Sequence, residues 1–100
     1  TYGVPVEEIV EGIKNGVRKV NIDTDLRLAS TGAIRRFLAE NPAEFDPRKY
    51  FKVSMDAMKQ LCVERYLAFG CEGQASKIKP ISLEKMADAY AKGQLNQIVK

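Results

Sequence analysis

A single strand-like segment, VRKVNI at residues 17–22, is the feature that most constrains the fold of this chain. Its hydrophobic residues alternate, which places Val20 and Ile22 on one face. The patterns of residues 5–15 and 25–40 predict helices before and after it. A lone strand cannot satisfy its own backbone groups, and helix–strand–helix is one step of a βα repeat that needs parallel neighbours. We therefore expect a piece cut from a larger α/β protein, a strand that pairs with another chain, or a segment that is not a strand here.

Two further helical patterns follow, over about residues 47–69 and 83–92. Asp46 followed by proline is typical of a helix start, and Ser82 is expected to cap the second helix. We expect this last helix to bury its apolar residues, which are Leu83, Met86, Ala87 and Tyr90. The chain is therefore predicted to be predominantly helical.

Composition excludes several classes of function. The net charge of +3 comes from basic residues scattered among acids, which is not the basic stripe of a nucleic-acid-binding protein. No apolar run approaches the ~20 residues that span a bilayer. Two cysteines, Cys62 and Cys71, do not make a disulfide framework, so a reducing, cytoplasmic setting is predicted. The chain has no His, so we expect it to hold no catalytic metal unaided and assign it no catalytic or metal-ligating residue.

The sequence NIDTD at residues 21–25 lies between the predicted strand and the next helix. Such a junction can bind an anion, because N–H groups of the first helical turn point outward and the helix dipole adds positive charge. Thr24 offers a hydroxyl, and Asn21 can donate and accept hydrogen bonds. Asp25 is expected to cap the helix, and Asp23 to accept from a sugar hydroxyl or a nearby Arg. A capped turn without any ligand explains the pattern at least as well, so both explanations stay open at this point.

GVRKVNIDTDLRLASTGAIRRFL at residues 16–38 resembles the last barrel strand and following helix of class II, zinc-dependent fructose-bisphosphate aldolases. NIDTD matches the N-[IV]-D-T-D motif of that family at every position. YGVPVEEIVEGIKNG upstream and NPAEFDPRKYFKVSMDAMKQLCVERYLAFG downstream resemble the flanking parts of the family, and GQASKIKPISL resembles the tail of its Calvin-cycle-type branch.

The resemblance implies a fold of the α/β class. Residues 1–40 correspond to the last βα portion of a (β/α)8 TIM barrel, with a helix at 5–15, a strand at 17–22 and a helix at 25–40, and residues 41–100 to a C-terminal helical extension. It also implies that Asn21, Ile22, Asp23 and Thr24 bind the dihydroxyacetone phosphate side of the substrate.

Arg48, in FDPRKYF, matches the arginine that family members extend across the dimer to the other phosphate of the substrate. The guanidinium fork suits that task because it binds phosphate oxygens bidentately. Some members carry a phosphate-binding Lys six positions earlier, where this chain has Pro42, so that role is not transferred. Lys77 and Lys79 are interpreted as solvated surface residues, although their role is open.

The parent enzyme implied by the resemblance is a homo-oligomeric lyase. It cleaves fructose 1,6-bisphosphate reversibly to dihydroxyacetone phosphate and glyceraldehyde 3-phosphate, with zinc bound by histidines upstream of this segment. The segment alone is predicted to be inactive. Two alternatives stay open: a non-catalytic helical fragment that self-associates through exposed apolar surface, and a phosphate-binding βα unit from another TIM-barrel enzyme.

Overall fold

The computed structural model describes residues 2–94, and this part of the chain is helical. The helices in it are α1 (Val6–Lys14), α2 (Thr24–Glu40), α3 (Pro47–Ala68) and α4 (Leu83–Ala91), with a 3-10 turn, η1 (Ala75–Lys77), before α4. Each α-helix begins and ends within one residue of the range expected from the sequence. The outer ends of the two predicted portions, residue 1 and residues 95–100, lie outside the described residues.

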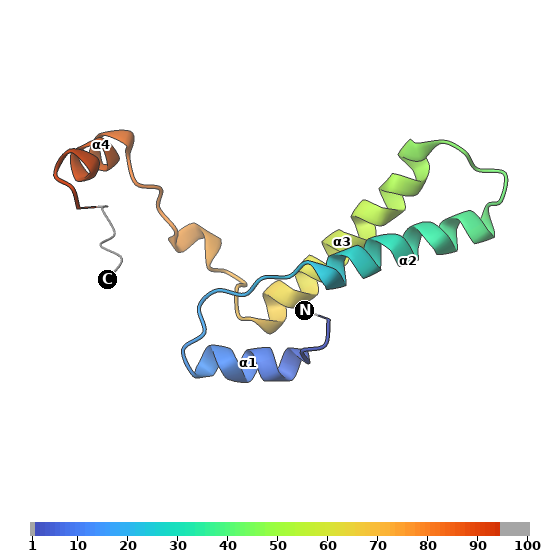
Figure 1. Ribbon diagram of the computed structural model, residues 1–100, viewed down its shortest axis with the longest axis horizontal. Helices are drawn as coiled ribbons and strands as arrows, with labels where there is room; N and C mark the ends of the chain where they lie inside the picture. The colour runs from blue at the N-terminus through green and yellow to red at the C-terminus, as the bar shows by residue number, and fades with distance from the viewer. Residues whose placement is uncertain (1, 95–100) are drawn as a thin grey trace.

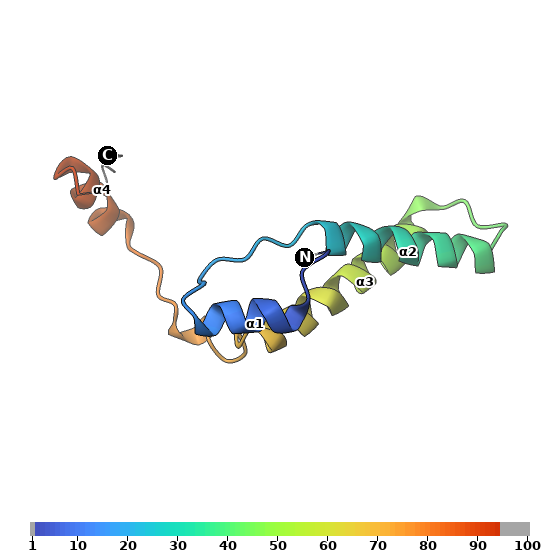
Figure 2. The same ribbon diagram turned by 60° about the horizontal axis from the view of Figure 1, so that its bottom comes forward.

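The strand predicted at residues 17–22 is absent: no strand occurs anywhere within residues 2–94. The segment runs as extended chain between α1 and α2, and Figures 1 and 2 show it as a long connection without a neighbouring strand. The backbone N–H groups of residues 18–22 bond to no other backbone group among the described residues. The prediction of a strand within this chain is therefore wrong, because strand pairing needs a partner that residues 2–94 do not supply.

The ends of the helices follow from local sequence. The Asp46 side chain accepts a hydrogen bond from the Arg48 N–H at the start of α3, and the Ser82 hydroxyl accepts one from the Lys85 N–H at the start of α4. Both caps are as expected. Beyond the end of α3, Gly70 has φ +75°, a left-handed conformation that costs glycine little.

Helices α2 and α3 form an antiparallel pair joined by residues 41–46, and they make the extensive helix–helix contact of the described chain (Figure 1). Ser54 of α3 is 6% exposed, and its Oγ lies 2.6 Å from that of Ser30 of α2. Small side chains at this crossing let the two backbones approach closely. The apolar residues of α2 that were expected at helical spacing are all partly buried; they are Ala29, Ala33, Ile34, Phe37 and Leu38.

Outside the α2–α3 pair the chain is open. Its radius of gyration is 19.8 Å, against about 13 Å for a compact chain of this length. No hydrophobic residue within residues 2–94 is fully buried. The expectation that α4 buries its apolar residues is wrong for three of the four, since Leu83 is 89% exposed, Tyr90 is 66% exposed and Ala87 is also exposed. Met86 is partly buried. Figure 1 shows the reason: α4 lies away from the other helices, at the end of an extended segment.

Candidate functional site

The residues predicted to bind phosphate lie where the extended segment enters α2. Asn21, Asp23 and Thr24 are exposed, and Ile22 is partly buried. The backbone N–H groups of residues 22–24 donate to no other backbone group among the described residues. They are followed directly by a helix of 17 residues, whose N-terminal end carries partial positive charge. The arrangement can therefore bind an anion through main-chain donors.

The side chain of Asn21 is held by a neighbour two residues earlier. Lys19 Nζ donates to Asn21 Oδ1 over 2.6 Å, which directs a cation toward the same exposed segment. Ile22 points the other way and lines an open hollow of about 470 Å³ between α1, the extended segment and the end of α3. The alternation expected from the sequence is thus preserved, with Asn21 outside and Ile22 toward apolar neighbours.

Two aspartates flank Thr24, and each is paired with an arginine. Asp23 occupies the N-cap position of α2 without capping it, and its Oδ1 accepts from Arg27 Nε over 2.9 Å. Of the two partners expected for Asp23, the nearby Arg is the one present. The expectation that Asp25 caps α2 is wrong, because α2 begins at Thr24 and the N-cap position is that of Asp23. Its Oδ2 lies 3.6 Å from Arg65 Nη2, on the last turn of α3.

Arg65 is the residue of this region that the sequence did not single out. It is separated from Asp25 by forty positions, so no local spacing relates the two. Its charge and its place in the last turn of a helix are signals of a favourable dipole interaction only. The contact depends on how α2 and α3 pack, which is a property of the fold.

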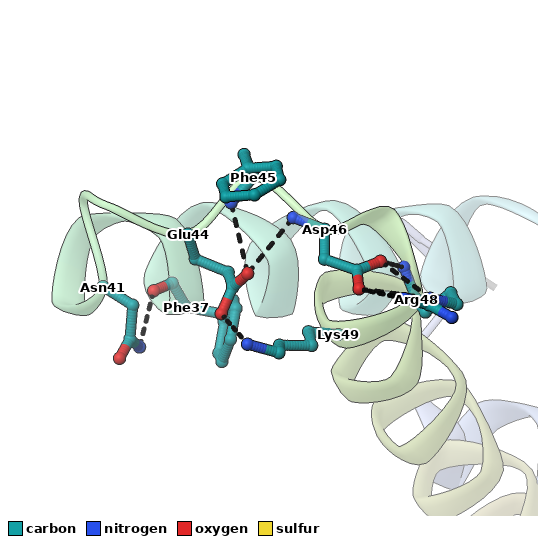
Figure 3. Close-up of polar contacts among 7 residues, drawn as sticks. All are labelled: Phe37, Asn41, Glu44, Phe45, Asp46, Arg48 and Lys49. Carbon is teal, nitrogen blue, oxygen red and sulfur yellow. Dashed lines mark hydrogen bonds and ion pairs between the residues drawn. The ribbon is translucent and has the colours of Figure 1, made fainter.

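A second polar cluster lies at the loop end of the α2–α3 pair (Figure 3). Glu44 accepts from the N–H groups of Phe45 and Asp46, at 3.2 and 3.1 Å, and from Lys49 Nζ at 2.7 Å. The hydrogen bond from Lys49 is the main cause that lowers the pKa of Glu44, and Glu44 in turn raises the pKa of Lys49. These contacts order the loop immediately before α3.

Arg48 emerges from this ordered start of α3 and is 90% exposed along its side chain. Its Nε and Nη2 donate to both carboxylate oxygens of Asp46, at 3.0 to 3.1 Å and 2.7 Å (Figure 3). The side-chain hydrogen bonds lower the pKa of Asp46 and raise that of Arg48. The guanidinium is therefore positioned by its own cap residue while one face stays open to solvent.

The two groups of predicted site residues lie at opposite ends of the α2–α3 pair. Residues 21–23 precede α2 and Thr24 is its first residue, whereas Arg48 follows the loop after α2, in the first turn of α3. A helix of 17 residues is about 25 Å long. Arg48 and Asn21 of one chain therefore lie too far apart to contact the same small molecule.

The described residues do not fit a metal centre: residues 2–94 contain no group of three His, Cys, Asp or Glu side chains that could hold an ion, and the sequence has no His. No helix among them is long and apolar enough to cross a membrane. Cys62 is partly buried and Cys71 exposed, and both are unpaired thiols. Lys77 and Lys79 lie exposed in the segment before α4.

Comparison with known proteins relates this arrangement to one family. Residues 1–74 match the family model described as fructose-bisphosphate aldolase class-II. The chain is 75% identical over 96 residues to the fructose-bisphosphate aldolase of Pseudomonas aeruginosa. These residues are 96% of the chain and 27% of the relative. Over its full length the chain is 64% identical to the fructose-bisphosphate aldolase of a Nostoc species, and the matched region is 28% of that relative.

Fructose-bisphosphate aldolase 2 of Rhodobacter capsulatus is 62% identical over 95 residues, which cover 95% of the chain and 83% of that relative. The chain thus spans little more than a quarter of the length of the first two relatives. With three quarters of its residues matched by the family model and the NIDTD motif unchanged, the chain belongs to the class-II fructose-bisphosphate aldolase family.

Proposed function

We propose that this chain is part of a fructose-1,6-bisphosphate aldolase, a lyase that cleaves its substrate reversibly to dihydroxyacetone phosphate and glyceraldehyde 3-phosphate. Residues 21–24 bind the phosphate and adjacent carbons of the dihydroxyacetone phosphate half. Arg48 binds the other phosphate, in the site of a second copy. The relatives bear the name of this activity, and the separation of the two groups in one chain supports a homo-oligomeric assembly.

One observation carries the phosphate assignment. The N–H groups of residues 22–24 have no backbone acceptor within the described chain, and they end at the positive pole of α2. A phosphate oxygen is the acceptor that such consecutive donors suit best. The hydroxyl of Thr24 and the amide of Asn21 add donors on the exposed side of the segment.

Residues 17–22 become the last strand of a (β/α)8 barrel when the remainder of the enzyme is present. The segment is already extended, and the N–H groups of residues 18–22 have no backbone acceptor among the described residues. In such barrels, phosphate sites form at the carboxyl ends of the last strands. Residues 21–24 occupy that place if residues 17–22 pair, while residues 41–100 form a helical extension outside the barrel.

We place zinc in the whole enzyme and assign its ligands to side chains outside this chain, since residues 2–94 contain no group of side chains that fits the ion and the sequence has no His. Zinc supplies Lewis-acid polarisation of the substrate ketone. The residues of this chain contribute binding and orientation: main-chain donors and Thr24 fix the phosphate, and Asn21 orients the carbons next to it. The two unpaired thiols agree with a reducing, cytoplasmic setting.

The decisive experiment is a coupled assay of the full-length protein with fructose 1,6-bisphosphate. Wild type is expected to turn over, and Thr24→Val and Asn21→Ala are each expected to raise KM or lower kcat/KM by at least about tenfold. Thr31→Val, an exposed threonine on the second turn of α2, is the matched control. Wild type without turnover, or unchanged kinetics in both site variants, would contradict the proposal.

A second function class is favoured by the exposed apolar surface. Phe51, Met55 and Tyr66 on α3 are each more than half exposed, as are Leu83 and Tyr90 on α4. We infer that the 100-residue chain by itself associates through these faces. Size-exclusion chromatography with light scattering tests this, and a clean monomer across a wide concentration range would contradict it.

A further inference from the structure

The ion pair between Asp25 and Arg65 differs from the others in the described chain. It joins two helices, whereas the other ion pairs within residues 2–94 are between residues two to five positions apart. The side chains of Asp25 and Arg65 are only 15% and 20% exposed. Every other pair has at least one partner that is more than half exposed. A charge pair this covered is screened little by solvent.

Stability alone is a weak reason for such a pair. Burying a guanidinium and a carboxylate costs desolvation that their attraction only partly offsets. The geometry is also incomplete: Arg65 Nε is buried without a hydrogen-bond partner among the described residues, and the closest charged contact is 3.6 Å. Two apolar side chains would pack the same crossing at less cost. The pair calls for an explanation other than packing.

The place of Asp25 supplies that explanation. It directly follows Thr24 and so lies next to the proposed phosphate site, where a carboxylate repels the ligand. Asp23, on the other side of Thr24, is already matched by the exposed Arg27. With Arg65 against Asp25, both acids beside the phosphate are matched by a cation. The positive pole of α2 is then not cancelled by the two carboxylates next to it.

We propose that Arg65 is a positioning residue of the phosphate site, which acts through Asp25. It neutralises the carboxylate beside the bound phosphate and holds the first turn of α2 against the last turn of α3. It does not touch the substrate. This inference rests on the proposed function, since it presupposes a phosphate at residues 21–24.

The test uses the full-length enzyme with Arg65→Met, which keeps the apolar stem and removes the charge. KM for fructose 1,6-bisphosphate and the inhibition constant of inorganic phosphate are both expected to rise by about tenfold, with kcat changed less than about threefold, because the cation that faces the Asp25 carboxylate from α3 is removed. Arg65→Lys is expected to recover most of the loss. Lys52→Met removes an exposed cation of α3 that is paired within its own helix, and is expected to change neither constant.

The double variant Asp25→Asn with Arg65→Met separates charge from packing. It removes both charges of the covered ion pair together, so it is expected to fold even where Arg65→Met does not, and to bind phosphate within about threefold of wild type. Unchanged constants in Arg65→Met overturn the inference. So does a double variant that binds phosphate about tenfold more weakly than wild type.

Failure of the proposed function is distinguishable from failure of this inference. If wild type does not cleave fructose 1,6-bisphosphate, the aldolase proposal falls. Calorimetric titration with inorganic phosphate then still compares wild type, Arg65→Met and the double variant. Weak binding in Arg65→Met that is restored in the double variant supports the role of Arg65, and equal binding in all three overturns it.

Discussion

The distance between Arg48 and Asn21 predicts that each active site is completed by a second copy of the protein. The two residues lie at opposite ends of the α2–α3 pair (Figure 1), separated by the length of a 17-residue helix, about 25 Å. Two full-length variants test this, Arg48→Ala and Asn21→Ala. Each is expected to be impaired alone, because every site of a uniform oligomer then carries the same lesion.

The expected loss for Arg48→Ala is about 10- to 100-fold in kcat/KM, the scale of a charge-assisted, bidentate contact to phosphate. The variant does not unfold α3, because Asp46 also caps that helix through the main-chain N–H of residue 48. Arg36→Ala, which removes an exposed arginine of α2, is the matched control and is expected to keep wild-type kinetics.

Mixing the two impaired variants should restore activity. In a dimer that contains one copy of each, one site has both lesions and the other has none. Random association of equal amounts makes about half of the dimers hybrid, so about a quarter of all sites are intact. Co-expression with two different affinity tags, followed by isolation of the doubly tagged species and a coupled assay, should give about half of wild-type activity per dimer.

The result that refutes this reasoning is a doubly tagged hybrid no more active than the mean of its two parents. That outcome would mean that Arg48 serves the site of its own chain, which would require α2 and α3 to separate, or that it serves no site. A hybrid of Arg36→Ala with Asn21→Ala keeps one intact site wherever Arg48 acts, so its activity does not report on Arg48. The activity of the Arg48→Ala and Asn21→Ala hybrid is therefore compared with that of both parents at matched concentration.

Three further outcomes follow from contacts in the structure. Ser54→Ala should lower the free energy of unfolding of the full-length enzyme by about 1–2 kcal/mol, since its hydroxyl lies 2.6 Å from that of Ser30. A double-mutant cycle with Ser30→Ala, measured by urea unfolding, should give a coupling energy of about 0.5–1.5 kcal/mol. Additive effects of the two substitutions would contradict the hydrogen bond. Because Arg48 lowers the pKa of Asp46, the stabilisation by that carboxylate is present above about pH 4 and is lost as the pH falls through its lower folded-state pKa, so Asp46→Asn should flatten this part of the stability profile. The isolated 100-residue chain should show neither aldolase turnover nor stoichiometric zinc, and turnover by sequence-verified material would contradict its assignment as a partial site.

The helices were predictable because their signals are local. Asp46 before a proline, Ser82 before an apolar pattern and glycine after α3 each act within a few residues. The side of α2 that faces α3 was predictable for the same reason, since helical spacing fixes which residues share a face. The exposure of α4 was not predictable from its sequence. Its amphipathic pattern indicates that the apolar face needs a packing partner, but not whether this chain supplies it, and within residues 2–94 Leu83 and Tyr90 remain exposed.

The candidate site shows the same division. The N–H donors of residues 22–24 follow from a local boundary between extended chain and helix, so NIDTD could be singled out from sequence. The pairing of Asp23 with Arg27 is also local, at a spacing of four residues. Arg65 could not be found that way, because its contact with Asp25 exists only once α2 and α3 pack together.

Residues 17–22 explain why a sequence pattern can be read correctly and still predict the wrong element. The alternation of Val20, Asn21 and Ile22 records which side chains face apolar surroundings, and the extended chain preserves it, with Ile22 in the apolar hollow and Asn21 exposed. A strand also requires hydrogen-bonded neighbours, which alternation does not encode. Because the N–H groups of residues 18–22 have no backbone acceptor in the described chain, we expect this segment to pair with residues outside residues 2–94. Amide hydrogen exchange should accordingly be fast at residues 18–22 in the isolated chain and slow in the full-length enzyme, and fast exchange in both would contradict a barrel strand here.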